Sequence, residues 1–274
     1  MNRMVALLPL ALLVACSKGG ENGTAESDGG NAPLAAGDAI GSATDIATSA
    51  ADPMPKFKPV REEERNKTLH FVYSYPAQAA AIPALKSYLD AERKESRDQI
   101  RQDYVDANGD LPGPMERTVE WRVVANLPGW LSLSGDFYEY SGGAHGMSGT
   151  GVLLWDKAAN RRREPLSLFT TAAAFNAALG PAYCAALNAE RGKRREQKVD
   201  PGSGGQFDKC VLPSEVTVLL GSGDKVHFTR IGLIADPYMA GPYAEGSYEV
   251  TLPVTPGLIR AVKPEYRSAF AVGR

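Results

Sequence analysis

The sequence predicts an α+β fold in which antiparallel β-sheets carry two main helices, and three observations support this. Segments that alternate apolar and polar residues occur in groups along the chain. Two long segments instead place apolar residues at the spacing of an amphipathic helix. The resulting order is strand, helix, several strands, helix and several strands, whereas a parallel α/β fold needs strands and helices that alternate one for one.

The first half of the globular region contains one predicted helix and four predicted strands. Residues 69–76, LHFVYSYP, alternate and are rich in aromatic residues, which is typical of a strand. Residues 82–107 have an amphipathic helical pattern, and Pro83 is acceptable in the first turn of a helix. Three more strands are predicted at residues 117–127, 130–140 and 149–157.

The second half begins with another predicted helix, over residues 172–195, which we expect Gly180 and Pro181 to kink or divide. Strands follow at residues 216–220, 226–233 and 248–253. We divide this region into an N-terminal lobe, residues 57–150, and a C-terminal lobe, residues 151–274, which form either one domain or two intimately packed ones.

The first 15 residues have the pattern of an export signal, with one positive charge followed by an apolar run too short to span a bilayer. The end of that run, Leu13-Val14-Ala15-Cys16, resembles the lipobox of bacterial lipoproteins. The resemblance implies cleavage before Cys16 and a lipid on that cysteine, and Ser17 behind it implies transport to the periplasmic side of the outer membrane. The alternative is an ordinary signal peptide with an incidental cysteine.

Residues 16–56 are predicted to be a disordered linker behind the lipid anchor, because small and polar residues there cannot bury enough apolar surface to offset their ordering entropy. If Cys16 carries a lipid, two cysteines remain, and Cys184 and Cys210 are predicted to form a disulfide. The alternative is that both are free, buried thiols.

The charge balance and the spacing of potential metal ligands argue against a nucleic-acid-binding protein and against a metal-binding protein. The chain has 30 basic and 32 acidic residues, a balance that argues against nucleic-acid binding. His70, His145 and His227 lack metal-ligand spacing, and the calcium-like motif DANGDLPG has Leu111 in place of the required glycine. We therefore predict no metal and no cofactor. We expect the basic clusters at residues 161–163 and 191–195 to be solvated, and the alternative is that they contact phosphate groups of lipopolysaccharide or an acidic protein surface.

The motif YSGGAHGM, residues 140–147, lies between two predicted strands. Its glycines suit a tight connection, since they adopt positive φ at little cost. A catalytic alternative has His145 activating Ser141 or Ser148, with Asp136 or Glu139 as the supporting carboxylate. No G-x-S-x-G nucleophile motif is present, so we favour a turn whose histidine bonds locally or lines a ligand surface.

Residues 236–254, DPYMAGPYAEGSYEVTLPV, precede and include the last predicted strand. Tyr238, Tyr243 and Tyr248 are candidates for a binding surface, because tyrosines supply rigid contact area. They are equally suited to closing the end of a sheet.

Three motifs, YSGGAHG, REPLSLF and DPYMAGPYAEGSYEVTLPV, resemble the extracytoplasmic domain shared by the anti-sigma factor RsiV and the non-catalytic part of the peptidoglycan deacetylase PdaC. The resemblance extends from about residue 69 to residue 254. It implies an envelope domain associated with peptidoglycan or with hydrolases of peptidoglycan. The deacetylase activity does not carry over, because the chain has no H-x-x-x-H pair.

We therefore predict a lipid-anchored periplasmic binding module that recognises peptidoglycan or a peptidoglycan-acting protein, and we predict no enzymatic activity. Two alternatives stay open, an inhibitor or decoy of lysozyme-type hydrolases and a Ser/His hydrolase. The predicted binding residues are Tyr140, Gly142, Gly143, His145, Tyr238 and Tyr243.

Overall fold

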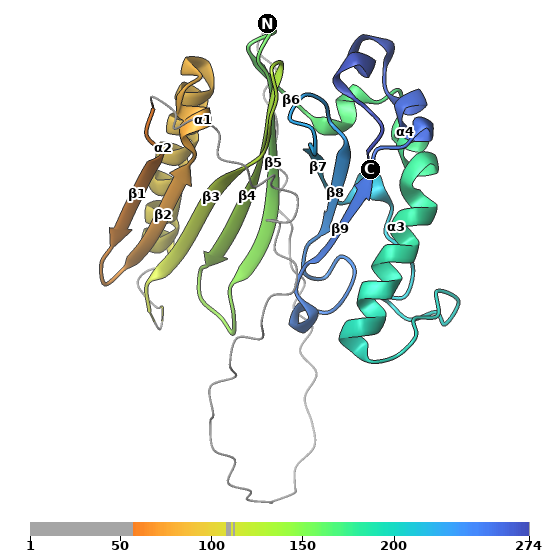
Figure 1. Ribbon diagram of the computed structural model, residues 1–274. Coiled ribbons are helices and arrows are strands. Elements are labelled where there is room, and N and C mark those ends of the chain that lie inside the picture. Colours follow the sequence, from red (N-terminus) through yellow and green to blue (C-terminus); the bar gives the residue numbers. More distant parts are fainter. Residues whose placement is uncertain (1–56, 108–110, 112, 274) are drawn as a thin grey trace, which may run out of the picture. The chain divides into compact units, whose positions relative to one another are not determined.

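The computed structural model describes residues 57–107, 111 and 113–273 (Figure 1). The predicted signal peptide, the predicted lipidation site Cys16 and the predicted linker up to residue 56 lie outside the described residues. Within the described residues, no helix combines the length and the apolar character that a membrane crossing requires.

The larger sheet contains six strands in the order of the sequence. The strands are β1 (Val60–Arg65), β2 (Leu69–Tyr75), β3 (Met115–Asn126), β4 (Trp130–Tyr140), β5 (Met147–Asp156) and β6 (Arg161–Arg163). Most neighbours pair antiparallel, which confirms the predicted α+β class. The expectation of purely antiparallel sheets is wrong at one place, because β2 and β3 pair in parallel. The long helix between them returns the chain to the starting end of β2, so β3 runs in the same direction.

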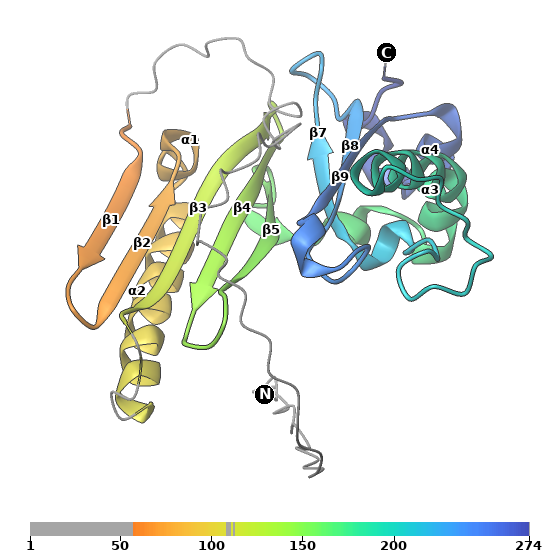
Figure 2. The same cartoon turned by 90° about the horizontal axis from the view of Figure 1, so that it is seen from below.

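Two helices connect β2 to β3, namely α1 (Ala77–Ala80) and the long α2 (Pro83–Asp106), which begins with the predicted proline. The long helix packs on β2 and β3 and buries Leu85, Leu89 and Ile100 against the sheet. Figures 1 and 2 both show that α2 covers one face of the sheet along β2 and β3, while β4 and β5 extend the sheet beyond the helix. The sheet therefore combines parallel and antiparallel pairs because of a single helical crossover.

The smaller sheet has three antiparallel strands, β7 (Thr217–Gly221), β8 (Arg230–Ala235) and β9 (Tyr248–Pro253). Helix α3 (Ala172–Arg195) packs on β9, and the short α4 (Pro256–Ala261) packs on α3. Pro181 lies inside α3 without dividing it. The predicted strand at residues 226–233 begins only at Arg230, because residues 222–227 form a turn around the Asp224 carboxylate.

The two faces of the larger sheet have different neighbours. The face toward α2 contributes to a core that includes Phe71, Trp121, Leu133 and Leu153. From the other face, Val124 packs with Leu219 and Ile234 of the smaller sheet. The two sheets therefore share an apolar contact layer between their facing surfaces.

The boundary predicted between residues 150 and 151 falls inside β5, a strand of the larger sheet.

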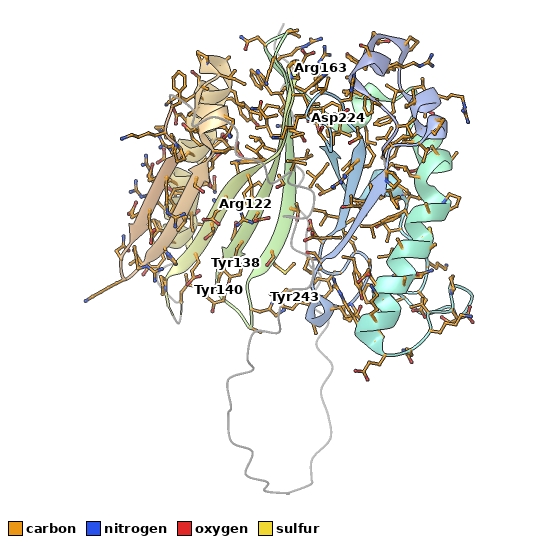
Figure 3. The ribbon with its side chains drawn as sticks, viewed as in Figure 1. Arg122, Tyr138, Tyr140, Arg163, Asp224 and Tyr243 are labelled. Atoms are coloured by element: carbon orange, nitrogen blue, oxygen red, sulfur yellow. A yellow bond between two sulfur atoms is a disulfide. The ribbon has the colours of Figure 1, made fainter. Side chains whose placement is uncertain are left out.

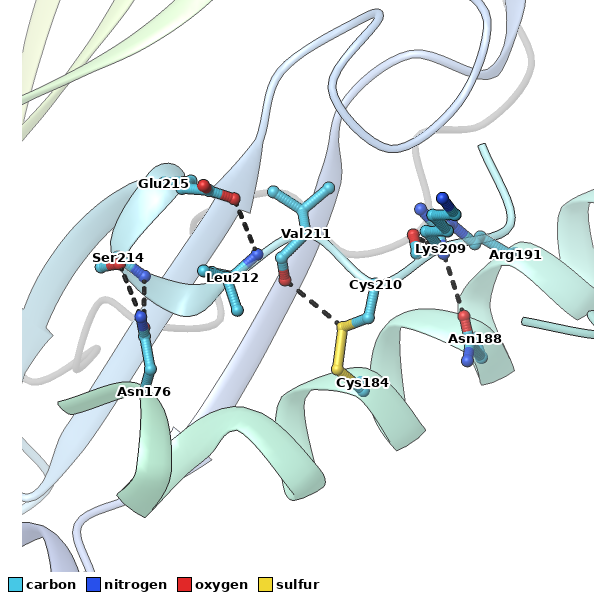
Figure 4. The surroundings of a disulfide bond; sticks show 10 residues. All are labelled: Asn176, Cys184, Asn188, Arg191, Lys209, Cys210, Val211, Leu212, Ser214 and Glu215. Atoms are coloured by element: carbon cyan, nitrogen blue, oxygen red, sulfur yellow. Dashed lines mark hydrogen bonds between the residues drawn. A yellow bond between two sulfur atoms is a disulfide. The ribbon is translucent and has the colours of Figure 1, made fainter. Parts of the chain in front are cut away.

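The predicted disulfide between Cys184 and Cys210 is confirmed, with the two Cα atoms 5.6 Å apart. Figure 4 shows that it joins α3 to the segment before β7. Asn176 and Ser214 reinforce the same attachment, because the Asn176 side chain exchanges two hydrogen bonds with Ser214 at 2.8 and 2.9 Å. This segment is therefore held along α3 at two separate points.

Candidate functional site

The motif YSGGAHGM forms the connection between β4 and β5, which pair antiparallel as predicted. Gly142 and Gly143 have φ values of 101° and 96°, a conformation that side chains other than glycine rarely adopt. The Tyr140 hydroxyl donates to the Gly143 carbonyl at 3.2 Å, which closes the turn on itself. The glycines therefore have a structural purpose, and His145 is carried on the return side of the turn.

An aromatic stack joins this turn to the loop between β8 and β9. The ring of His145 stacks on that of Tyr243 with centroids 4.0 Å apart, and the ring of Tyr238, tilted by 34° against that of Tyr243, has its centroid 5.7 Å away. The Tyr243 hydroxyl donates to the Gly146 carbonyl at 2.8 Å, and Nδ1 of His145 lies 2.9 Å from the same carbonyl oxygen. We call His145, Tyr243 and Tyr238 the aromatic stack.

The predicted binding residues thus come together from two motifs that are far apart in the sequence. Tyr140, Gly142, Gly143 and His145 belong to one loop, while Tyr238 and Tyr243 belong to the other. Figure 3 shows Tyr140 and Tyr243 at the same end of the two sheets. Tyr248, the third tyrosine of the second motif, is instead fully buried in β9 and contributes to the core.

Tyr238 is unusual in both backbone and exposure. Its φ is 72°, and 49% of its surface is exposed. An aromatic residue at positive φ is a conformational outlier, which typically costs about 1–3 kcal/mol and occurs most often at functional sites. The backbone N–H of Tyr238 donates to the Gly241 carbonyl at 3.0 Å, so the loop itself holds the ring toward solvent.

Asp236 anchors the same loop to the larger sheet. Its Oδ2 accepts a hydrogen bond from the Thr150 backbone N–H at 3.0 Å, whereas its buried Oδ1 has no partner among the described residues. Burial raises the pKa of this carboxyl, and the hydrogen bond from Thr150 only partly opposes that effect. The loop between β8 and β9 is therefore fixed to β5 as well as to the turn.

The sequence analysis did not identify Tyr138, whose ring packs against the turn at Gly146. The Tyr138 ring lies against Gly146, where an added Cβ would be only 2.5 Å from the ring. Partial burial raises the pKa of Tyr138, as do nearby Glu116 and Tyr243. The two-residue period of a strand could have identified Tyr138, because it precedes Tyr140 by two residues and so lies on the same face of β4.

The contacts of His145 do not assemble a nucleophile and a supporting carboxylate. Among the described residues, neither Ser141 nor Ser148 hydrogen bonds to His145. The two candidate carboxylates pair with arginines instead: Asp136 with Arg122 at 2.5 Å, and Glu139 with Arg117 at 2.8 Å. The part of the chain that the structure describes also contains no group of three potential metal ligands.

Residues 62–148 match the family model of Deacetylase PdaC, which confirms the predicted PdaC-like resemblance for this segment. A DUF3298 family protein from Pseudomonas aeruginosa PAO1 is similar in structure, with a TM-score of 0.49 and 17% identity over 81% of this chain and 99% of the other. A DUF3298 family member from Bacteroides fragilis NCTC 9343 has a TM-score of 0.46 and 16% identity over 73% and 91% of the two chains.

No curated protein shows significant similarity to the chain. The match to the family model begins in β1 and ends just after the first residue of β5, so it includes the whole glycine-histidine turn. Tyr238 and Tyr243, the other half of the aromatic stack, lie beyond it. Over residues 62–148, a segment of α+β structure, the chain is therefore similar to the PdaC family.

Proposed function

We propose that the protein is a lipid-anchored binding module on the periplasmic side of the outer membrane and that it recognises peptidoglycan. The observation that carries this proposal is the aromatic stack, in which an exposed tyrosine at strained φ extends a histidine–tyrosine pair built from two distant motifs. Stacked rings offer a flat apolar face with polar edges, which suits a sugar ring that has an apolar face and polar hydroxyls.

The envelope assignment of this proposal rests on the sequence. The lipobox-like run ending at Cys16 supports lipid anchoring, and the RsiV-like and PdaC-like motifs support an association with the cell wall. A disulfide between Cys184 and Cys210 suits an oxidising compartment. The binding role is favoured over catalysis because the hydrogen bonds of His145 lead to backbone and not to a serine or carboxylate.

The test is co-sedimentation of the full-length protein with purified peptidoglycan sacculi. We expect Tyr238→Ala to abolish sedimentation and Tyr238→Phe to preserve it, because only the first removes the ring. Phe57→Ala is the matched control, since Phe57 is an aromatic residue of similar exposure, 51% against 49% for Tyr238, outside the aromatic stack. Gly143→Ala serves as a second probe, since it strains the turn at a φ of 96° without removing a ring of the aromatic stack.

Absence of sedimentation by the wild-type protein would contradict peptidoglycan as the ligand and would direct attention to peptidoglycan-acting proteins. Equal loss in Tyr238→Ala and Phe57→Ala would contradict the aromatic stack as the binding surface. A thermal unfolding curve of each variant separates loss of binding from loss of fold.

A further inference from the structure

The larger sheet brings the start of β1 and the whole of β6 to the same end. Val60, the first residue of β1, pairs with Tyr75 at the end of β2, and β3 runs parallel to β2. The antiparallel pairs that follow return β5 to this end, where Asp156 pairs with Arg161 of β6. The described chain therefore enters, at Phe57, at the end that carries β6 and opposite to the glycine-histidine turn (Figure 1).

The segment after β9 packs beside β6 at this end. It consists of α4 and the 3-10 helix η5 (Pro264–Ala269). The guanidinium carbon of Arg163 lies 5.6 Å from the centre of the Tyr266 ring, which is itself 6.0 Å from the ring of Trp130 at the start of β4. Because side chains alternate along a strand, Arg161 lies on the same face of β6 as Arg163. The two segments therefore lie side by side.

These segments, residues 156–164 and 256–270, have an excess of positive charge, and we call them the basic end. They contain seven basic and three acidic residues, although the whole chain has 30 basic and 32 acidic ones. Two arginines are paired, Arg162 with Glu164 at 2.9 Å and Arg163 with Asp156 at 3.2 Å. Within the two segments, Glu265 is the one acidic residue without an ion pair. Four basic side chains form no ion pair with any described residue, namely Arg161, Arg260, Lys263 and Arg267.

The arginines near the aromatic stack, at the other end of the sheets, are in a different situation. Arg117 pairs with Glu139 at 2.8 Å. Arg195 pairs with both Glu245 and Asp208, each at 2.9 Å. Carboxylates therefore offset the charge of these arginines, whereas most of the positive charge of the basic end is left for a partner outside the described residues.

Exposed apolar side chains accompany this charge. Val226 and Val272 are 53% and 54% exposed. The segments that carry them meet at the Phe228–Phe270 bridge, directly after η5, and the turn at Asp224 lies at the same end of the molecule as β6 (Figures 1 and 3). Basic side chains beside exposed apolar ones suit a membrane surface, because anionic headgroups attract the charges and the apolar side chains enter the interface.

We propose that the basic end docks on the anionic phospholipid headgroups of the membrane that holds the lipid anchor. This inference rests on the proposed function, because it takes lipid anchoring from there. The predicted linker has 40 residues between Cys16 and Phe57, and a flexible coil of that length spans about 35 Å. The anchor thus keeps the basic end close to the membrane, so a weak contact is sufficient. The aromatic stack, at the opposite end, then points away from the membrane and toward peptidoglycan.

The experiment is hydrogen exchange of the full-length protein reconstituted into vesicles of phosphatidylcholine, either alone or mixed with phosphatidylglycerol. We expect the backbone amides of residues 256–272 to exchange about threefold more slowly in the mixed vesicles, because only these present an anionic headgroup. Raised salt should remove this difference. The amides of residues 141–146, at the opposite end, should exchange equally in both kinds of vesicle.

Two variants with the same change in net charge test which end is responsible. The basic-end variant combines Arg161→Gln, Arg260→Gln and Lys263→Gln. The control variant combines Lys67→Gln, Lys198→Gln and Lys209→Gln. The control lysines are exposed, lie in the β1–β2 turn and in the loop after α3, and form no ion pair with the described residues. We expect the basic-end variant to lose the difference between the vesicles and the control variant to preserve it. Thermal unfolding curves show whether both variants are folded.

Flotation of the same samples distinguishes this inference from the proposed function. Flotation with pure phosphatidylcholine vesicles reports the lipid anchor alone, and its absence would contradict lipid anchoring. Flotation only with the mixed vesicles would in that case still support the basic end, whereas flotation with neither would reject both. For an anchored protein, equal exchange in the two kinds of vesicle, or an equal loss of the difference in both variants, would overturn the inference and leave an acidic protein surface as the alternative partner.

Discussion

The helices α2 and α3 each contain 24 residues and each pack on a sheet, yet they are attached in different ways. The first buries three side chains and is otherwise joined to β1 by ion pairs, among them Arg97–Glu62 and Arg101–Glu64, both at 2.6 Å. The second buries five side chains, including a fully buried arginine, and is covalently tied to the segment before β7.

The comparison concerns how much of its sheet each helix covers and how firmly each helix is held. The apolar face of α2 is short, so the helix covers β2 and β3 and leaves the aromatic side chains of β4 partly open. The apolar face of α3 continues into Arg191, whose guanidinium ties the helix end to the loop that carries Tyr238 and Tyr243 through the Ala240 carbonyl. We therefore expect adjustable packing along α2 and fixed packing along α3, and the following changes test that difference.

Removal of the disulfide should have the largest effect. The bond spans 26 residues of sequence, and the chain-entropy relation gives a loss of about 3.5 kcal/mol for a loop of this length. We expect this loss in the free energy of unfolding for Cys184→Ser combined with Cys210→Ser, measured by denaturant titration. Hydrogen exchange should accelerate in α3 and remain slow at Leu89 in α2, and equal acceleration in both helices would contradict the comparison.

Arg191→Met should be the next most destabilising change. The Arg191 side chain donates to the carbonyls of Ala240 and Lys209 at 2.8 and 3.2 Å, and burial lowers the pKa of its guanidinium. Methionine fills similar space but leaves the Lys209 carbonyl without its donor and the Ala240 carbonyl with only the 3.4 Å hydrogen bond from Arg195, so we expect a loss of about 2 kcal/mol. A stability equal to that of the wild type would mean that the cost of burying the charge cancels its hydrogen bonds.

Glu245→Gln should act in a pH-dependent way at the same end of α3. Partial burial alone would raise the pKa of Glu245, but Arg195, bound through both carboxylate oxygens, and the Tyr248 hydroxyl lower it below its ordinary value. A lowered folded-state pKa adds stability above the unfolded-state pKa, and this stability is lost as the pH falls through the folded-state value. We expect a loss of about 1 kcal/mol at pH 7.

That loss should shrink toward zero in acid, where the wild-type carboxylate is itself protonated. Thermal unfolding of wild type and Glu245→Gln at neutral and acidic pH provides the measurement. A difference that does not depend on pH would show that the charge of Glu245 does not contribute.

Arg97→Met on α2 should have the smallest effect. Arg97 pairs with Glu62 at 2.6 Å, and 27% and 24% of the two side chains are exposed, so solvent screens the pair. We expect a loss of about 0.5 kcal/mol, which added salt should reduce further. Urea titrations at low and high salt measure it, and a loss as large as that of Arg191→Met would remove the distinction between the two helices.

The periodicity of apolar residues predicted most of the helices and strands. It failed for a strand whose residues are almost all charged. Residues 69–76 and 130–140 are strands because their alternation is strong. The first strand, β1, was missed because its sequence, VREEER, has almost no apolar residue, and it forms by pairing with β2 and through ion pairs with α2. The parallel pairing of β2 and β3 was also missed, since the direction of a strand is not encoded in its alternation.

The candidate site was predictable in part. The turn followed from its glycines, and the tyrosines of the second motif followed from their density, but the distance between His145 and Tyr243 depends on how the two sheets pack. The expectation that residues 191–195 are solvated is wrong for Arg191, which is fully buried. Its burial depends on backbone carbonyls from two distant segments, and no local pattern reveals them.

The parallel pairing of β2 with β3 also has a kinetic consequence. Strands β3, β4 and β5 join through short turns, so their pairing closes small loops and is inexpensive in entropy. Pairing of Phe71 with Arg117 must instead wait until α2 is folded and in place. We therefore expect the β3–β5 meander to be largely formed in the transition state for folding and the β1–β2 hairpin to dock afterwards. The surface between α2 and β4, where Glu92 and Phe137 line a common cavity, would then be among the last parts of the sheet to form.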